Sequence, residues 1–131
     1  MMKTPTILLV EDELQQREAL EMLLDSEGYK VLAMDSAEQA LETVSREHPT
    51  MIVTDVKLPD MDGITMFEQV REKPQLQHIP FIFITGYNDP DAIVRLKTLG
   101  GVGYVTKPYD LEVLLEMIKK FLPSHGIPAP V

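Results

Sequence analysis

The chain has 131 residues, 44% hydrophobic and 25% charged, which is the balance of one globular domain large enough to bury a core. It has no cysteine, which excludes disulfides and thiolate metal sites, and its apolar runs are far shorter than the ~20 residues that span a bilayer. The net charge of −9 disfavours direct binding of nucleic acid. We therefore expect a cytoplasmic domain with neither a membrane nor a nucleic-acid partner.

Apolar runs alternate with helical patterns along the first third of the chain. Thr6–Val10 is predicted to form the first strand, and a helix follows over residues 13–27 with Gly28 as its C-terminal cap. Lys30–Met34 is predicted to form the second strand, and Ser36 opens a capping-box pattern at the start of the second helix. The apolar stripe of the first helix consists of Ala19, Leu20, Leu23 and Leu24.

The same alternation continues to residue 122. Short apolar runs predict three further strands, at 51–54, 80–84 and 102–105. The third helix is expected to end near Pro74, and Asp89 and Asp110 are expected to cap the fourth and fifth helices. Four methionines fit core positions better than a cofactor site: Met22, Met34, Met51 and Met66.

Strands that alternate with helices are typical of a parallel sheet covered on both faces. Right-handed crossovers leave few ways to wind such a chain. We predict an α/β fold, a flavodoxin-like (βα)5 doubly wound sheet with strand order 2-1-3-4-5, over residues 1–122. Residues 123–131 contain three of the ten prolines and are predicted to form a tail or the start of a linker.

Polar residues stand at the ends of four of these apolar runs. In a parallel sheet these ends meet at one edge, where open α/β sheets bind ligands. The predicted order makes Asp12 and Asp55 neighbours and leaves Asp35, another strand-end carboxylate, at the margin of the sheet. Glu11 adds a third carboxylate to the pair. The four polar residues are Asp12, Asp55, Thr85 and Lys107.

Clustered carboxylates repel one another unless a cation joins them, and carboxylate oxygens suit Mg²⁺ bound together with a phosphate group. Asp55 is then placed to act as a nucleophile that forms an acyl phosphate. Lys107 and Thr85 are expected to hold the remaining phosphoryl oxygens.

Four motifs in order resemble the response-regulator receiver domains of two-component signalling, over about residues 5–122. Glu11-Asp12 resembles the acidic pair of that family, and residues 55–63 resemble its phosphoacceptor loop. Thr85-Gly86 is similar to its switch position, and residues 104–109 to its fifth-strand signature.

The resemblance implies a phosphorylation-activated switch rather than an enzyme that acts on other molecules. Asp55 would accept a phosphoryl group from a sensor histidine kinase or a phosphotransfer protein, and Thr85 and Tyr104 would form the switch pair. The output domain or partner protein would bind the surface made by the fourth helix, the strand at 102–105 and the last helix. The bond between Lys107 and Pro108 would be cis.

The resemblance also implies a set of ligands for Mg²⁺. Asp12 and Asp55 would bind the ion directly, Glu11 would act mostly through water, and the backbone carbonyl of Lys57 would complete the protein's ligands. The side chain of Lys57 stands just past the acceptor, where we expect it to slow or alter hydrolysis of the phosphoryl group.

Two other classes of function stay open at this point. An aspartate-nucleophile phosphatase also forms an aspartyl phosphate, but such enzymes have a second aspartate two residues after the nucleophile, where this chain has Lys57. A phosphorylation-independent interaction module on the same fold is the other alternative, because a fold alone does not fix a function.

Overall fold

The computed structural model describes residues 4–122, which form a five-stranded parallel sheet with the order β2-β1-β3-β4-β5. The predicted α/β class and strand order are therefore confirmed, whereas the predicted tail at 123–131 lies outside the described residues. The strands are β1 (Thr6–Val10), β2 (Lys30–Met34), β3 (Met51–Asp55), β4 (Phe81–Gly86) and β5 (Gly103–Lys107).

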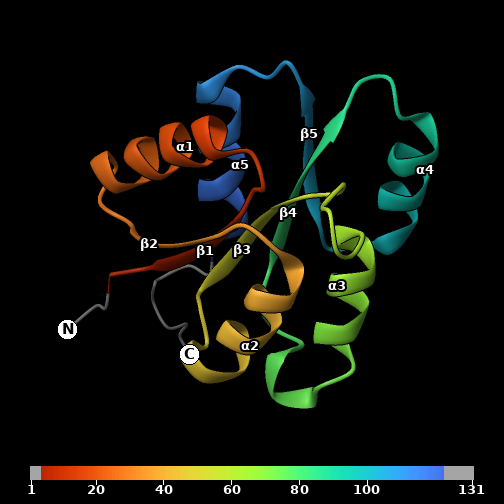
Figure 1. Ribbon diagram of the computed structural model, residues 1–131, viewed down its shortest axis with the longest axis horizontal. Helices are drawn as coiled ribbons and strands as arrows, with labels where there is room; N and C mark the ends of the chain where they lie inside the picture. Colours follow the sequence, from red (N-terminus) through yellow and green to blue (C-terminus); the bar gives the residue numbers. More distant parts are fainter. Residues whose placement is uncertain (1–3, 123–131) are drawn as a thin grey trace.

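Five helices cover the two faces of this sheet (Figure 1). The side chains of α1 and α5 pack on one face, and those of α2, α3 and α4 pack on the other. None of the helices in the described part is long and apolar enough to cross a bilayer. The helices are α1 (Leu14–Ser26), α2 (Ala37–Glu47), α3 (Gly63–Arg71), α4 (Pro90–Leu99) and α5 (Leu111–Phe121), with a 3-10 turn at Pro74–Leu76.

The central strands are buried on both faces, so neighbouring residues of one strand belong to different cores. In β1, Ile7 and Leu9 pack toward α1 and α5, whereas Leu8 and Val10 pack toward the other three helices. This alternation follows from the two-residue period of a strand. The continuous apolar sequence of each central strand is thus what a sheet with two covered faces requires.

The predicted helix starts are confirmed by their capping hydrogen bonds. The Ser36 hydroxyl oxygen accepts from the backbone N–H of Gln39 at 3.2 Å, and Asp89 and Asp110 likewise accept from the first turns of α4 and α5. At the other end of α1, Gly28 has a φ of 96°, a conformation that favours glycine after a helix.

Two predictions about these elements were wrong in detail. β3, β4 and β5 extend beyond the predicted ends, so that Asp55, Thr85 and Lys107 belong to these strands rather than following them. Met22, predicted to lie in the core, is 72% exposed. α1 buries Leu20 and Leu24, and a residue two positions from Leu20 is turned ~200° around the helix, toward solvent.

Candidate functional site

Three carboxylates meet where β1 and β3 end side by side. Val10 pairs with Thr54 in the sheet, which brings the next residues of the two strands together. Glu11, Asp12 and Asp55 each offer an oxygen within 4.8 Å of the others. Glu11 and Asp55 are buried, with 1% and 4% of their surface exposed, whereas Asp12 is exposed. The cluster therefore has a dry inner side and an outer side open to solvent.

The cluster carries an unfavourable concentration of negative charge. Burial raises the pKa of the Asp55 carboxyl above its ordinary value, and the hydrogen bond with Glu11 and the charge of Glu11 raise it further. One oxygen each of Glu11 and Asp55 is buried with no hydrogen-bond partner among residues 4–122. Buried polar atoms normally have partners, so this donor set fits a hard divalent cation with oxygen ligands.

Lys107 supplies a positive charge from the end of β5. Its ammonium nitrogen lies 3.6 Å from Oδ1 of Asp55 and 3.9 Å from Oε1 of Glu11. The charge of Lys107 acts to lower the pKa of Asp55, but it does not offset burial and the neighbouring carboxylates. The peptide bond from Lys107 to Pro108 is cis, as predicted.

A cleft of about 200 Å³ brings the acceptor, hydroxyl and ammonium candidates together. It is lined by Asp55, Lys57, Ile84, Thr85, Gly86 and Lys107. The hydroxyl of Thr85 is buried and has no hydrogen-bond partner within the described chain. A group with several oxygens that entered this cleft could therefore accept a hydrogen bond from Thr85 and pair with Lys107.

Tyr104 lies apart from this cleft. It stands opposite Phe83 in the pairing of β4 and β5, and it lines a hollow of about 410 Å³ between β5 and α5. The structure thus brings together every predicted site residue except Tyr104, which lies two positions before Thr106, the strand partner of Thr85.

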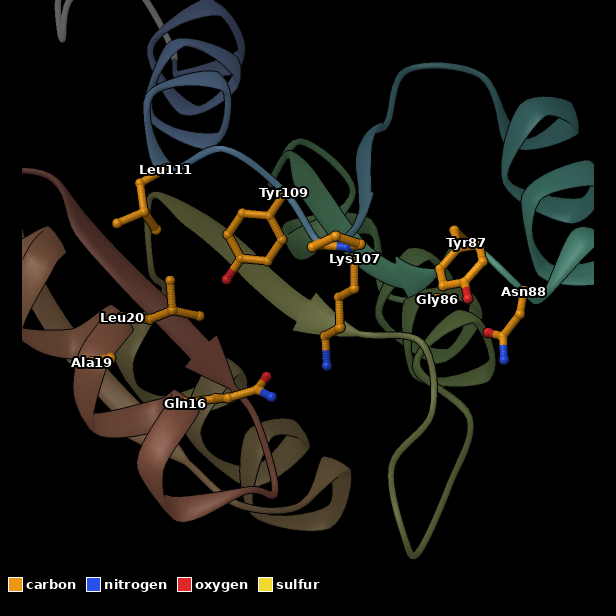
Figure 2. A pocket seen from close by; sticks show the side chains of 10 residues that line it. Gln16, Ala19, Leu20, Gly86, Tyr87, Asn88, Lys107, Tyr109 and Leu111 are labelled. Carbon is orange, nitrogen blue, oxygen red and sulfur yellow. The ribbon is translucent and has the colours of Figure 1, made fainter.

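A larger hollow of about 560 Å³ opens beside the cleft, between α1 and the loops that follow β4 and β5 (Figure 2). Lys107 extends into it with Tyr109 on one side and Tyr87 on the other, and Gln16 faces it from α1. The ring of Tyr87 is 73% exposed. Most of the lining is apolar and includes Ala19, Leu20, Pro108 and Leu111. Gly86 and Asn88 complete it.

Sequence reasoning assigned no role to Tyr109 or Arg17, two residues that touch or hold the site. Burial raises the pKa of Tyr109 to about 12, and the negative charges of Asp55 and Glu11 contribute to this shift. Arg17 donates to the backbone carbonyl of Glu11 at 2.9 Å and so holds the segment that carries the acidic pair. No spacing rule links either residue to the strand ends. Asp60 belongs to the predicted phosphoacceptor loop, and the structure shows that its side chain connects this loop to α2.

Residues 7–119 match the family described as the response regulator receiver domain. The chain belongs to this family. The predicted resemblance is thereby confirmed, and receiver domains are signalling modules of two-component systems rather than enzymes that turn over other molecules.

Two curated relatives illustrate the range of proteins in which receiver domains occur. The chain is 34% identical over 122 residues to sporulation initiation phosphotransferase F of Bacillus subtilis, covering 93% of this chain and 97% of the relative. It is also 34% identical over 114 residues to the response regulator protein FleR of Pseudomonas aeruginosa, covering 87% of this chain but only 24% of FleR. The similarity to FleR is therefore confined to one part of a longer protein.

Solved structures agree with this assignment. The signal receiver domain of a signal transduction histidine kinase from Syntrophus aciditrophicus is 30% identical, with a TM-score of 0.86 and coverage of 98% of this chain and 97% of that one. The chemotaxis response regulator CheY4 of Vibrio cholerae is 26% identical, with a TM-score of 0.83 and coverage of 92% and 100%.

Proposed function

We propose that this receiver domain is a phosphorylation-activated switch in which Asp55 accepts a phosphoryl group from a phosphohistidine of a sensor kinase or phosphotransfer protein. The observation that carries the proposal is the cleft that Asp55 shares with Thr85 and Lys107, directly beside the carboxylate cluster. A nucleophile, a hydrogen-bond donor and a positive charge around one small space are the parts that phosphoryl transfer needs.

In the transfer, an oxygen of Asp55 attacks the phosphorus atom and the bond from phosphorus to the histidine nitrogen breaks. The electron pair of that bond returns to the imidazole, and Asp55 becomes an acyl phosphate. Lys107, whose ammonium lies 3.6 Å from Asp55 Oδ1, pairs with the phosphoryl oxygens. Lys107 thereby stabilises the negative charge that the new group brings into a nearly dry site.

Glu11, Asp12 and Asp55, with the backbone carbonyl of Lys57, would hold Mg²⁺ at the open side of the cluster. When bound there, Mg²⁺ supplies positive charge that offsets the repulsion among the carboxylates and the phosphoryl oxygens. The raised pKa of Asp55 supports this proposal, and so do the buried oxygens of Glu11 and Asp55 that have no hydrogen-bond partner among residues 4–122.

Thr85 would sense the phosphoryl group on Asp55, and the resulting conformational change would reach Tyr104. The hydroxyl of Thr85 gains a partner when it donates to a phosphoryl oxygen, and the ring of Tyr104 then moves inward beside β4. The surface made by α4, β5 and α5 changes as a result and binds an output domain or partner protein. A local electrostatic event would thus bias a surface between two states.

The hollow of Figure 2 is the approach that we propose for the phosphodonor. It leads to Lys107, and its apolar lining suits a partner helix that presents a histidine. The exposed ring of Tyr87 and the side chain of Leu111, 49% exposed, would lie in the contact.

The test is incubation with acetyl phosphate and Mg²⁺, followed by intact-mass measurement. We expect one added phosphoryl group in the wild-type protein and none in Asp55→Asn. Asp35→Asn, which removes an exposed strand-end carboxylate outside the cluster, is the matched control and should be phosphorylated normally. The chain has no tryptophan, so mass replaces fluorescence as the readout. If the wild-type protein gained no adduct, the phosphorylation-independent interaction module would be favoured instead.

A further inference from the structure

Asp60 lies in the loop between β3 and α3, yet its side chain is bound to a different helix. Its two carboxylate oxygens accept hydrogen bonds from the backbone N–H groups of Ala37 and Glu38, at 3.1 and 2.8 Å. These residues open α2, where the first N–H groups have no partner within the helix and the helix dipole favours a negative charge. Asp60 therefore clamps the phosphoacceptor loop, residues 55–63, against the N-terminus of α2.

The clamp is charged at neutral pH. Partial desolvation alone would raise the pKa of the Asp60 carboxyl, but hydrogen bonds from backbone N–H groups, those of Glu38 and Ala37 first and then those of Asp60 and Met61, bring that pKa below its ordinary value. A carboxylate that accepts two backbone hydrogen bonds is a stronger cap than a neutral acceptor.

The middle of the phosphoacceptor loop has few other polar anchors. At its ends, the Val56 N–H donates to the Ile84 carbonyl at 2.9 Å and the Gly63 N–H donates to the Val56 carbonyl at 2.6 Å. Between them, residues 57–61 make no hydrogen bond with another backbone group of the described chain. Leu58 and Met61 pack against the core, which restrains the loop but does not orient its carbonyl groups.

We propose that Asp60 is a positioning residue of the cation site, which holds the backbone carbonyl of Lys57 in place to join Asp12 and Asp55 around the ion. The inference rests on the proposed function, because it assigns a role toward the Mg²⁺ proposed above. Lys57 is three residues from the clamp. A loop that is already ordered loses less conformational entropy when it binds an ion, so the clamp strengthens binding without touching the ion.

Ser36 provides a matched control, because it caps the same helix without holding the loop. Its hydroxyl oxygen accepts from the Gln39 N–H at 3.2 Å, one position after the bonds that Asp60 accepts. Ser36→Ala therefore removes a cap from the first turn of α2 and leaves the contact between Asp60 and that turn in place. Any effect that passes only through the stability of α2 should appear in Ser36→Ala as well as in Asp60→Ala.

The experiment titrates Mg²⁺ into ¹⁵N-labelled protein and follows the amide signals of Asp12 and Lys57, with urea unfolding in EDTA measured on the same samples. We expect both alanine variants to be less stable than the wild type. We expect only Asp60→Ala to bind Mg²⁺ more weakly, by about tenfold, the lower end of the loss seen when a metal site loses an outer support. Asp60→Asn keeps one oxygen acceptor and should bind with intermediate affinity.

Three outcomes would decide against the inference. If Asp60→Ala bound Mg²⁺ as tightly as the wild type, the apolar contacts of Leu58 and Met61 would be sufficient to hold the loop. If Ser36→Ala weakened binding as much as Asp60→Ala, Asp60 would act only through helix stability. If the wild-type protein bound no Mg²⁺, the proposed function would fail first, and this inference with it.

Discussion

Replacing Asp55 with asparagine should make the metal-free protein more stable at pH 7, although it removes the residue that we propose as the acceptor. Asp55 has two other carboxylates within 4.8 Å, and each such pair of full charges costs about 3.5 kcal/mol at an effective dielectric constant of about 20. The attraction between Asp55 and the Lys107 ammonium, 3.6 Å away, is worth about 4.6 kcal/mol at the same dielectric constant. Keeping Asp55 charged would thus cost about 2 kcal/mol before burial is considered, and at pH 7 the folded protein meets this cost either as repulsion or by holding a proton on the carboxyl.

The assay is urea unfolding in EDTA at pH 7, where we expect Asp55→Asn to gain about 1–2 kcal/mol of stability, because a neutral amide needs neither the charge nor the bound proton. Lys107 keeps Glu11 as a partner at 3.9 Å. Adding Mg²⁺ should make the wild type the more stable of the two proteins. A ligand at 100 times its dissociation constant stabilises the folded state by about 2.7 kcal/mol. Only the wild type keeps all three carboxylates that would bind the ion. Asp35→Asn should change neither result, because Asp35 is exposed and outside the cluster.

The difference in stability between Asp55→Asn and the wild type should shrink as the pH is lowered. Because burial and Glu11 raise the pKa of Asp55 above 3.8, the folded state holds a proton that the unfolded state has released over the interval between the two values. The stability of the wild type therefore falls as pH rises through this interval, and the gap to Asp55→Asn narrows as pH is lowered toward about 4. A variant that was less stable than the wild type in EDTA at pH 7 would refute this reasoning, since the ion pair with Lys107 would then outweigh the repulsion.

Three further changes test other parts of the site. Lys57→Ala should shorten the half-life of phosphorylated Asp55 about two- to fivefold, since an exposed charge contributes up to about 1 kcal/mol; equal half-lives would dismiss a role of this side chain in hydrolysis. Gly63→Ala would press a Cβ atom onto the carbonyl oxygen of Asp55 and should destabilise the fold by about 1–3 kcal/mol in urea; a neutral result would mean that the loop yields easily. Arg95→Ala breaks a partly exposed ion pair with Asp62 and should lower the free energy of unfolding by less than about 1 kcal/mol, so a larger loss would reveal a structural role.

The fold was predictable because its signals are local. Each strand is a short apolar run with a helix pattern after it, and the caps at Ser36, Asp89 and Asp110 mark where three of the helices begin. The strand ends were less predictable. Thr85 and Lys107 are polar but still pair with neighbours in the sheet, because parallel pairing uses backbone groups and continues regardless of side-chain polarity.

The error at Met22 has a different physical origin. The prediction relied on residue type, whereas the period of the helix decides which side is buried. Leu20 and Leu24, four residues apart, face the sheet, and Met22 between them faces solvent. Methionine is apolar, but one exposed apolar residue on a helix surface is normal and is tolerated.

The candidate site divides in the same way between local and non-local signals. The cluster of Glu11, Asp12 and Asp55 was predictable because strand order alone makes neighbours of two strand ends. The contacts of Arg17 and Asp60 were not, because they depend on how a helix and a loop lie against those ends. Periodicity places a residue on a face of its own element, but it says nothing about which carbonyl or N–H group lies across from it.

The structure already contains a source of free energy for the switch that we propose. Thr85 has a buried hydroxyl without a partner among residues 4–122, and such a group costs about 1–3 kcal/mol. A phosphoryl oxygen on Asp55 that accepts from this hydroxyl would recover that amount only in the conformation that brings them together. This difference corresponds to a shift of about 5- to 150-fold in the ratio of two conformations, the usual range of allosteric coupling. Since Thr85 pairs with Thr106 and Tyr104 lies two residues away on the same strand, β5 connects the surroundings of Thr85 with the hollow beside α5.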